Sequence, residues 1–161
     1  MFERFGEFDS AKEINDTAVN LRREGDKESL IVLAKENGID EGIVELFLDG
    51  TLLYLCDDMS AAVGKLDVEK KEIDCAEIIE DWMEYIRDMC FKDVEFAKAV
   101  RCKNKNLKDC IGEILKWSFK NQHPVDSSLM KAAGVTAGKC TLGIPGMATA
   151  KKIIREYYLG K

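Results

Sequence analysis

Apolar residues recur at helical spacing through the first fifty positions and are interrupted by short polar turns. Ser10 followed by Glu13 forms a capping-box pattern, and a glycine follows each apolar run (Gly25, Gly38 and Gly50). The pattern predicts three consecutive helices, at residues 10–25, 26–38 and 40–50. Helices of this length joined by tight turns make a small helical module.

The stretch after the third helix is less regular. Residues 51–56 (TLLYLC) are apolar and lie between Gly50 and Asp57, so they fit either a short buried strand or the start of another helix. The charged stretch 66–74 (LDVEKKEID) is interpreted as the connection to the second half of the chain.

A long helix is predicted to open the second half, with Asp74 as its N-cap and Glu77 in the capping-box position. Its apolar stripe consists of Cys75, Ile79, Trp82, Ile86 and Met89. Further periodic segments predict helices at 93–100, 107–119, 125–133 and 147–159. Gly112 weakens the helix 107–119 by about 1 kcal/mol relative to alanine, which indicates close packing of a neighbour.

These elements predict an all-α fold, a helical bundle of about seven to eight short to medium helices with at most one short strand near 51–56. With 161 residues the chain can bury a core without disulfides or a metal. Two parts are expected: an acidic N-terminal helical module (1–74) and a basic-ended helical domain (75–161). The stripe with Trp82 and Met89 also leaves open a homodimer through the long helix.

Charge is distributed unevenly between these parts. Residues 1–74 hold 9 basic and 19 acidic residues, a net charge of −10, whereas residues 75–161 hold 15 and 11, a net charge of +4. From Lys98 onward, 13 basic residues face 4 acidic ones. A chain whose ends have opposite sign can be steered towards a charged partner, and the basic end could meet nucleic-acid phosphates. Mutual attraction of the two halves is the alternative.

The sequence offers little catalytic chemistry. The only histidine, His123, has no cysteine or carboxylate at ligand spacing, so no metal site is predicted. The six cysteines form no C-x-x-C pair and are expected to be reduced thiols. A cysteine nucleophile, with Cys110 or Cys140 as the thiol, has no local support. We therefore expect no enzyme and no cofactor.

No apolar run approaches the roughly 20 residues that cross a bilayer, so no membrane partner is expected. The acidic start of the chain is unlike a signal peptide, which begins with basic residues and continues with apolar ones. Both observations favour a cytoplasmic protein.

The candidate binding residues are basic and fall between residues 101 and 155. Lysine and arginine neutralise phosphates but carry no sequence code, so they predict nonspecific or auxiliary binding. A solubilising surface is the alternative. The predicted set consists of Arg101, Lys103, Lys105, Lys108, Lys139, Lys151, Lys152 and Arg155. Lys139 lies in a glycine-rich loop (134–146) that approaches the phosphate-binding pattern but has too short a spacer and follows a predicted helix.

Several segments of the second half are similar to a known family. The runs DVEFAKAV (93–100) and KNKNLKDCIGEILKWSFK (103–120), then Val125-Asp126 and a last helix with Tyr157-Tyr158, resemble the PcfK-like family of conjugative plasmids and related mobile elements. That family overlaps type II-A anti-CRISPR proteins, which inhibit Cas9. The resemblance covers about 75–161.

The resemblance implies a binding protein in a bacterial host cell, without chemistry of its own, whose partner is a Cas9-type CRISPR effector nuclease. Two routes are open: the acidic module occupies a positively charged nucleic-acid channel, or the basic surface docks on the effector's bound nucleic acid. The alternative is a conjugation-associated DNA-binding accessory protein that uses the basic half.

Overall fold

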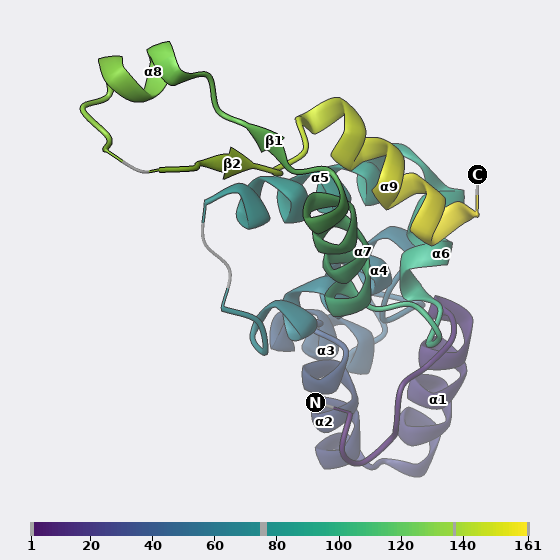
Figure 1. Ribbon diagram of the computed structural model, residues 1–161. Helices are drawn as coiled ribbons and strands as arrows, with labels where there is room; N and C mark the ends of the chain where they lie inside the picture. Colours follow the sequence, from purple (N-terminus) through teal and green to yellow (C-terminus); the bar gives the residue numbers. More distant parts are fainter. Residues whose placement is uncertain (1, 75–76, 137, 161) are drawn as a thin grey trace.

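The computed structural model describes residues 2–74, 77–136 and 138–160. Within these ranges the chain forms nine helices and one two-stranded antiparallel sheet (Figure 1). The helices are α1 (Ala11–Glu24), α2 (Lys27–Glu36), α3 (Glu41–Leu48), α4 (Asp58–Lys70), α5 (Ile78–Lys92), α6 (Val94–Arg101), α7 (Leu107–Lys120), α8 (Ser127–Ala132) and α9 (Met147–Leu159), and the strands are β1 (His123–Pro124) and β2 (Thr141–Leu142). The predicted all-α bundle is confirmed.

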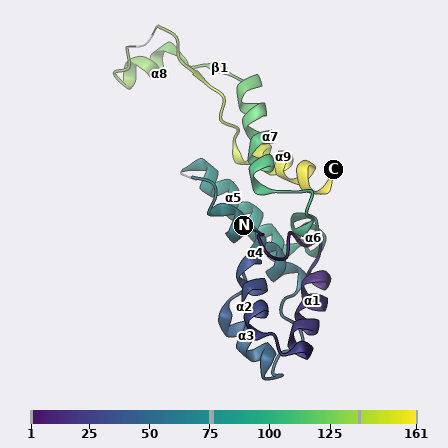
Figure 2. The same cartoon turned by 90° about the horizontal axis from the view of Figure 1, so that it is seen from below.

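Buried side chains form two clusters that meet at α4. The first cluster gathers apolar side chains of α1, α2 and α3, and the second gathers those of α5, α6, α7 and α9. On α4, Ala61 belongs to the first cluster, whereas Ala62 and Leu66 belong to the second. Figures 1 and 2 show α1–α3 at one end of the molecule and α7 and α9 beyond α4. Because α4 serves both clusters, the experiments below keep the full chain.

Most of the stretch interpreted as a connection is helical and belongs to α4. Asp57 caps this helix by accepting a hydrogen bond from the Ser60 backbone N–H at 2.7 Å, and the Ser60 hydroxyl accepts one from the Asp57 N–H at 2.9 Å. Both Lys65 and Glu69 on α4 are buried. A helix buried on most sides lacks the one-sided apolar stripe that identifies a surface helix in a sequence.

Residues 51–56 are neither strand nor helix. Their two buried residues, Leu55 and Cys56, donate their backbone N–H groups to the Asn15 side-chain oxygen at 2.8 and 3.1 Å. The Asn15 amide in turn donates to the Cys56 carbonyl at 2.8 Å. One side chain on α1 thus satisfies the backbone groups that a partner strand would otherwise have to bond.

The long helix α5 begins later than predicted. Its first residue is Ile78, and Glu77 precedes it with φ 56° and no side-chain capping bond, so the predicted Asp74 cap is wrong. Cys75 of the predicted stripe lies outside the described residues. Trp82 is fully buried in the chain's own core, so it offers no exposed surface for the homodimer considered above.

The two clusters are fixed together at a joint, formed by Asn37, Gly38, Gly64, Lys65 and Arg101. A Cβ on Gly64 would lie 2.2 Å from the Asn37 carbonyl oxygen, and one on Gly38 would lie 2.3 Å from the Gly64 oxygen. Gly38 also has φ 67°, in the left-handed region. Only glycine at both positions lets the end of α2 approach α4 this closely.

Gly112 behaves differently from the glycines of the joint. Apart from its chain neighbours and the backbone of α7 itself, no atom lies within 4 Å of the place where its Cβ would stand, so the predicted close neighbour is absent among the described residues.

An arm, residues 121–146, projects from the body of the molecule between α7 and α9 (Figures 1 and 2). It carries β1, α8 and β2, and α8 has no buried residue. The arm is closed by a hydrogen bond from the Val125 N–H to the Cys140 carbonyl at 2.9 Å. At its base, a Cβ on Gly143 would lie 2.3 Å from the Ser118 carbonyl oxygen. The arm is therefore anchored at its base and largely uncovered beyond it.

Candidate binding surfaces and the buried charge cluster

The eight cations predicted as one binding surface lie in several places. Arg101 was predicted as part of this surface but is buried. It is only 1% exposed at the end of α6, where its Nη2 donates to the Asn37 side-chain oxygen at 2.8 Å. Burial lowers the pKa of this guanidinium. Arg101 is the last residue of α6 and belongs to the joint, so it is not part of an exposed basic surface.

Lys105 is also held by the protein itself. Its Nζ donates to the Tyr157 carbonyl at 2.6 Å and lies 4.6 Å from the centroid of the Tyr157 ring. The Tyr157 hydroxyl accepts a hydrogen bond from the Asn106 N–H at 3.0 Å. Lys105 therefore fixes the loop before α7 against α9.

Three exposed cations stand on the outer side of α9: Lys151, Lys152 and Arg155. The opposite side of α9 is held in the core by Ala150, Ile154 and Tyr158, so the backbone beneath these cations is well fixed. Lys152 lies 3.8 Å from Glu156, whereas Lys151 and Arg155 have no carboxylate partner among the described residues. The Lys151 Nζ lies 5.0 Å from the centroid of the Tyr85 ring. We call Lys151, Lys152 and Arg155 the α9 cations.

The remaining predicted cations are exposed but separate. Lys103 lies in the turn between α6 and α7, where its backbone N–H donates to the Asp9 carboxylate at 2.9 Å, and Lys108 lies in the first turn of α7. Lys139 lies on the arm. The structure thus keeps seven of the eight residues outside the core, with only the α9 cations on one helical surface.

A buried charge cluster, which the sequence did not reveal, lies beneath the joint. The Lys65 side chain is completely buried, and its Nζ donates to the carbonyls of Cys102 and Lys105 at 2.7 and 2.6 Å. The same nitrogen forms an ion pair with Glu7 at 2.6 Å and lies 3.8 Å from Glu69. Lys65 therefore ties the N-terminal segment and the loop before α7 to α4.

Glu69 is the acidic member of this cluster. Its Oε2 accepts a hydrogen bond from the backbone N–H of Leu107, the first residue of α7, at 2.9 Å. Burial raises the pKa of the Glu69 carboxyl to about 7, against the opposing effect of the Lys65 charge. Lys65 and Glu69 lie four residues apart, the spacing of two neighbours on one face of a helix. In the sequence, such a pair looks like an ordinary ion pair on the surface.

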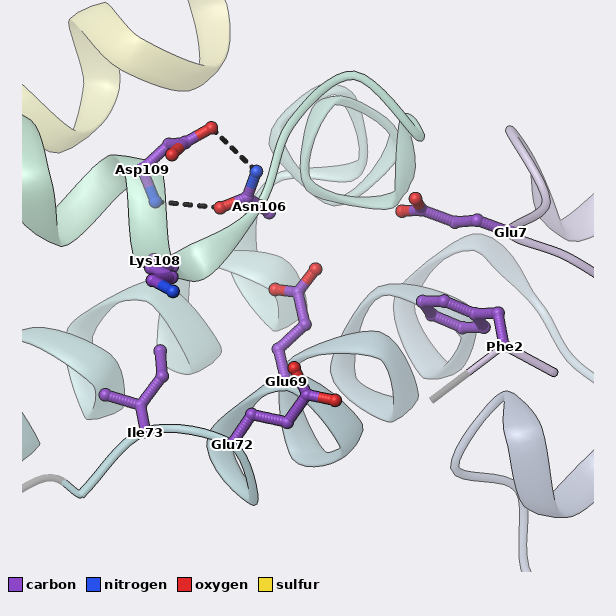
Figure 3. Close-up of a pocket in the computed structure, with 8 residues that line it drawn as sticks. All are labelled: Phe2, Glu7, Glu69, Glu72, Ile73, Asn106, Lys108 and Asp109. Atoms are coloured by element: carbon purple, nitrogen blue, oxygen red, sulfur yellow. Dashed lines mark hydrogen bonds between the residues drawn. The ribbon is translucent and has the colours of Figure 1, made fainter.

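A cavity of about 280 Å³ opens beside Glu69 (Figure 3). Its polar lining is mostly acidic, from Glu7, Glu69, Glu72 and Asp109, with Lys108 as the one cation. At its edge Asn106 caps α7 by accepting the Asp109 N–H at 2.7 Å. Among the described residues, the lining contains no serine, cysteine or histidine.

Three of the five described thiols, those of Cys56, Cys90 and Cys110, are buried in environments that suppress reactivity. Burial raises the pKa of Cys56, Cys90 and Cys110 to about 12 in each case, which leaves the nucleophilic thiolate scarce at neutral pH. Cys102 and Cys140 are partly exposed, and all five described cysteines are free. Within the described part of the chain, no group of three or more His, Cys, Asp and Glu side chains is placed to hold a metal ion.

Comparison with protein-family models, with curated proteins and with solved structures finds no match to this chain. No helix in the described ranges is long and apolar enough to cross a membrane. The class that the fold and its surfaces define is therefore a small, mainly helical protein with a rigid body, a projecting arm and exposed cations on its last helix.

Proposed function

We propose that this protein is a non-enzymatic inhibitor from a mobile element that binds a guide-loaded Cas9-type effector. The observation that carries the proposal is the set of α9 cations, which stand in solvent on a helix whose other side is locked in the core. Cations on a fixed helix can neutralise phosphates without first losing backbone entropy. The resemblance of residues 75–161 to the PcfK-like family supplies the identity of the partner.

The α9 cations favour the second of the two routes considered above, docking on nucleic acid that the effector holds. Lys151 and Arg155 lie one helical turn apart, about 6 Å along the axis. Neighbouring phosphates on one strand are separated by a similar distance, so two adjacent charges can be met together. Because phosphate contacts carry no sequence code, the effector must provide the specificity through protein contacts.

Co-purification with guide-loaded Cas9, run beside duplex DNA alone at about 50 and 200 mM salt, tests the proposal. We expect the full chain to bind the loaded nuclease and the double variant Lys151→Glu/Arg155→Glu to bind at least about tenfold more weakly. The matched control is Lys92→Glu/Lys98→Glu, which reverses two exposed lysines that already pair with Asp88 and Glu95. Equal binding by both variants would rule out docking through α9.

The alternative function is binding of DNA itself by a conjugation accessory protein. The lack of carboxylate partners at Lys151 and Arg155 favours it equally, since free cations bind any phosphate backbone. Binding to duplex DNA that falls steeply between the two salt concentrations, without binding to the nuclease, would support this alternative. The absence of binding to either partner would overturn both functions.

A further inference from the structure

Two surfaces at opposite ends of the molecule combine large exposed apolar side chains with charge of opposite sign. The first is the arm together with Phe119 and Lys120 at its base, and the second lies on α3 and the loop that follows it. Figures 1 and 2 place the arm and α3 far apart, with α4 between them. A contact between the two surfaces within one chain is therefore impossible.

The arm surface is apolar and basic. Phe119, Leu129, Leu142 and Ile144 are each more than 60% exposed, far beyond what side chains of this size show when they pack within their own chain. Lys120, Lys131 and Lys139 are exposed with no carboxylate partner among the described residues. The one acidic residue of the arm, Asp126, is engaged in capping α8 through the Ser128 N–H at 2.8 Å.

The α3 surface is apolar and acidic. Leu53 and Tyr54 are 70% and 68% exposed, and Leu46 on α3 is 40% exposed. The Leu52 N–H donates to the Leu46 carbonyl at 2.9 Å, which holds the start of this loop against α3. Glu41 and Glu45 on α3 are exposed with no cationic partner among the described residues.

The sequence around each surface carries charge of almost one sign, acidic around α3 and basic around the arm. Between Lys35 and Lys65 the chain holds seven acidic residues (Glu36, Asp40, Glu41, Glu45, Asp49, Asp57 and Asp58) and no basic residue. Between Glu113 and Glu156 it holds seven basic residues (Lys116, Lys120, Lys131, Lys139, Lys151, Lys152 and Arg155) and the single acid Asp126. Two arms would repel each other, and so would two α3 surfaces, whereas an arm and an α3 surface attract.

We propose that the arm of one molecule docks on the α3 surface of a second copy, so that the protein associates head to tail. Apolar side chains form the centre of this contact, and the opposite charges around them set its polarity. The arm's length is close to the roughly 20–30 residues that one side of a stable interface supplies. A head-to-tail contact leaves one arm and one α3 surface free at the ends of each assembly, so association continues into rings or chains beyond the dimer.

Sedimentation of the full chain over a wide concentration range tests this proposal, which does not depend on the function proposed above. At low salt the average mass is expected to rise from the 18.1 kDa of the monomer and to continue past twice that value. At about 0.5 M salt the assemblies are expected to shrink, because exposed charges are screened. A monomer at every concentration up to several hundred micromolar at low salt would overturn the proposal.

Two variants that each lose one surface show which surface contacts which. The arm variant is Leu129→Ser/Leu142→Ser, and the α3 variant is Leu53→Ser/Tyr54→Ser. Each alone is expected to self-associate at least about tenfold more weakly than the unaltered chain. An equimolar mixture is expected to form a 1:1 dimer that does not grow, because the α3 variant's arm meets the arm variant's α3 surface.

Measured alone, the two variants also distinguish this contact from symmetric ones. An arm-to-arm contact would leave the α3 variant fully associating, and an α3-to-α3 contact would leave the arm variant fully associating. Either result contradicts the head-to-tail polarity. Val94→Ser is the matched control, since Val94 is 39% exposed on α6, outside both surfaces, and it is expected to associate like the unaltered chain.

Discussion

At the joint, backbones approach so closely that only glycine fits, whereas along the arm even leucine side chains leave most of their surface exposed. Gly64 lies against the Asn37 carbonyl, and the neighbouring Lys65 ammonium has four oxygen neighbours within 4 Å. In the arm, α8 buries no residue, and the ladder between β1 and β2 has only two residue pairs. The two regions are therefore expected to tolerate substitutions differently. Changes at the joint should destabilise the fold, whereas the arm is free to contact another molecule.

The largest effect is expected from removing the buried charge at the joint. Lys65→Met leaves Glu69 buried without its nearest cation and leaves two buried carbonyls without a donor. Losing one partner of a buried pair typically lowers the free energy of unfolding by about 3–5 kcal/mol. Chemical denaturation would measure this loss. Lys98→Met removes an exposed lysine paired with Glu95 and should lower it by no more than about 0.5 kcal/mol. Similar values for both variants would refute a structural role for Lys65.

A smaller but still severe effect is expected where the backbones meet. A methyl group on Gly64 would collide with a backbone oxygen that cannot rotate away, so Gly64→Ala should lower the free energy of unfolding by about 3 kcal/mol. Gly112→Ala places the same group in the interior of α7 with nothing but α7 itself within 4 Å, and it should raise stability by about 0.5–1 kcal/mol. Thermal unfolding should show changes in stability of opposite sign for the two variants. A stabilised Gly64→Ala variant would contradict the close approach of the backbones.

Next in size is the pH dependence that Glu69 introduces at the joint. Its folded pKa of about 7 exceeds the ordinary 4.5, so between these values the folded chain holds a proton that the unfolded chain releases. Stability from this group is therefore present below about pH 4.5 and is lost as the pH rises to about 7, by about 1–3 kcal/mol. Denaturation at pH 5, 6, 7 and 8 should show a decline that Glu69→Gln reduces, because an amide does not titrate in this range. The amide oxygen can still accept the Leu107 N–H, so the local structure is kept. An equal slope in the variant would mean that Glu69 is not responsible.

The sequence could predict the elements whose signals lie in neighbouring residues. The first helix was predicted correctly because its signals are local: the Ser10 side chain accepts the Glu13 N–H at 3.2 Å, and Gly25 ends the helix with φ 73°. In the second half, α8 falls within the predicted segment 125–133. Elements with their own caps and turns carry this information in neighbouring residues.

The joint was not predictable because its determinants are distant in the sequence. Arg101 contacts Asn37, 64 residues away, and Asn15 satisfies the backbone of residues about 40 positions later. Lys65 and Glu69 look like solvent-facing charges until the loop before α7 and the N-terminal segment cover them. A pattern read along one helix contains none of these partners, so the sequence favoured a linker at α4 and a basic surface at Arg101.

The smallest effect on folding is expected in the arm, and it completes the comparison. Leu129 and Leu142 are more than 60% exposed, so replacing both with serine removes much less buried apolar surface than a substitution in the core does. The free energy of unfolding, measured in dilute solution at about 0.5 M salt to keep the chain monomeric, should change by less than about 0.5 kcal/mol. Ile114→Ser, at a fully buried position of α7, should cost at least about 3 kcal/mol under the same conditions. If the arm variant also lost more than about 1 kcal/mol, its leucines would have to pack on the body, and the arm would belong to the fold instead of being free for a second molecule.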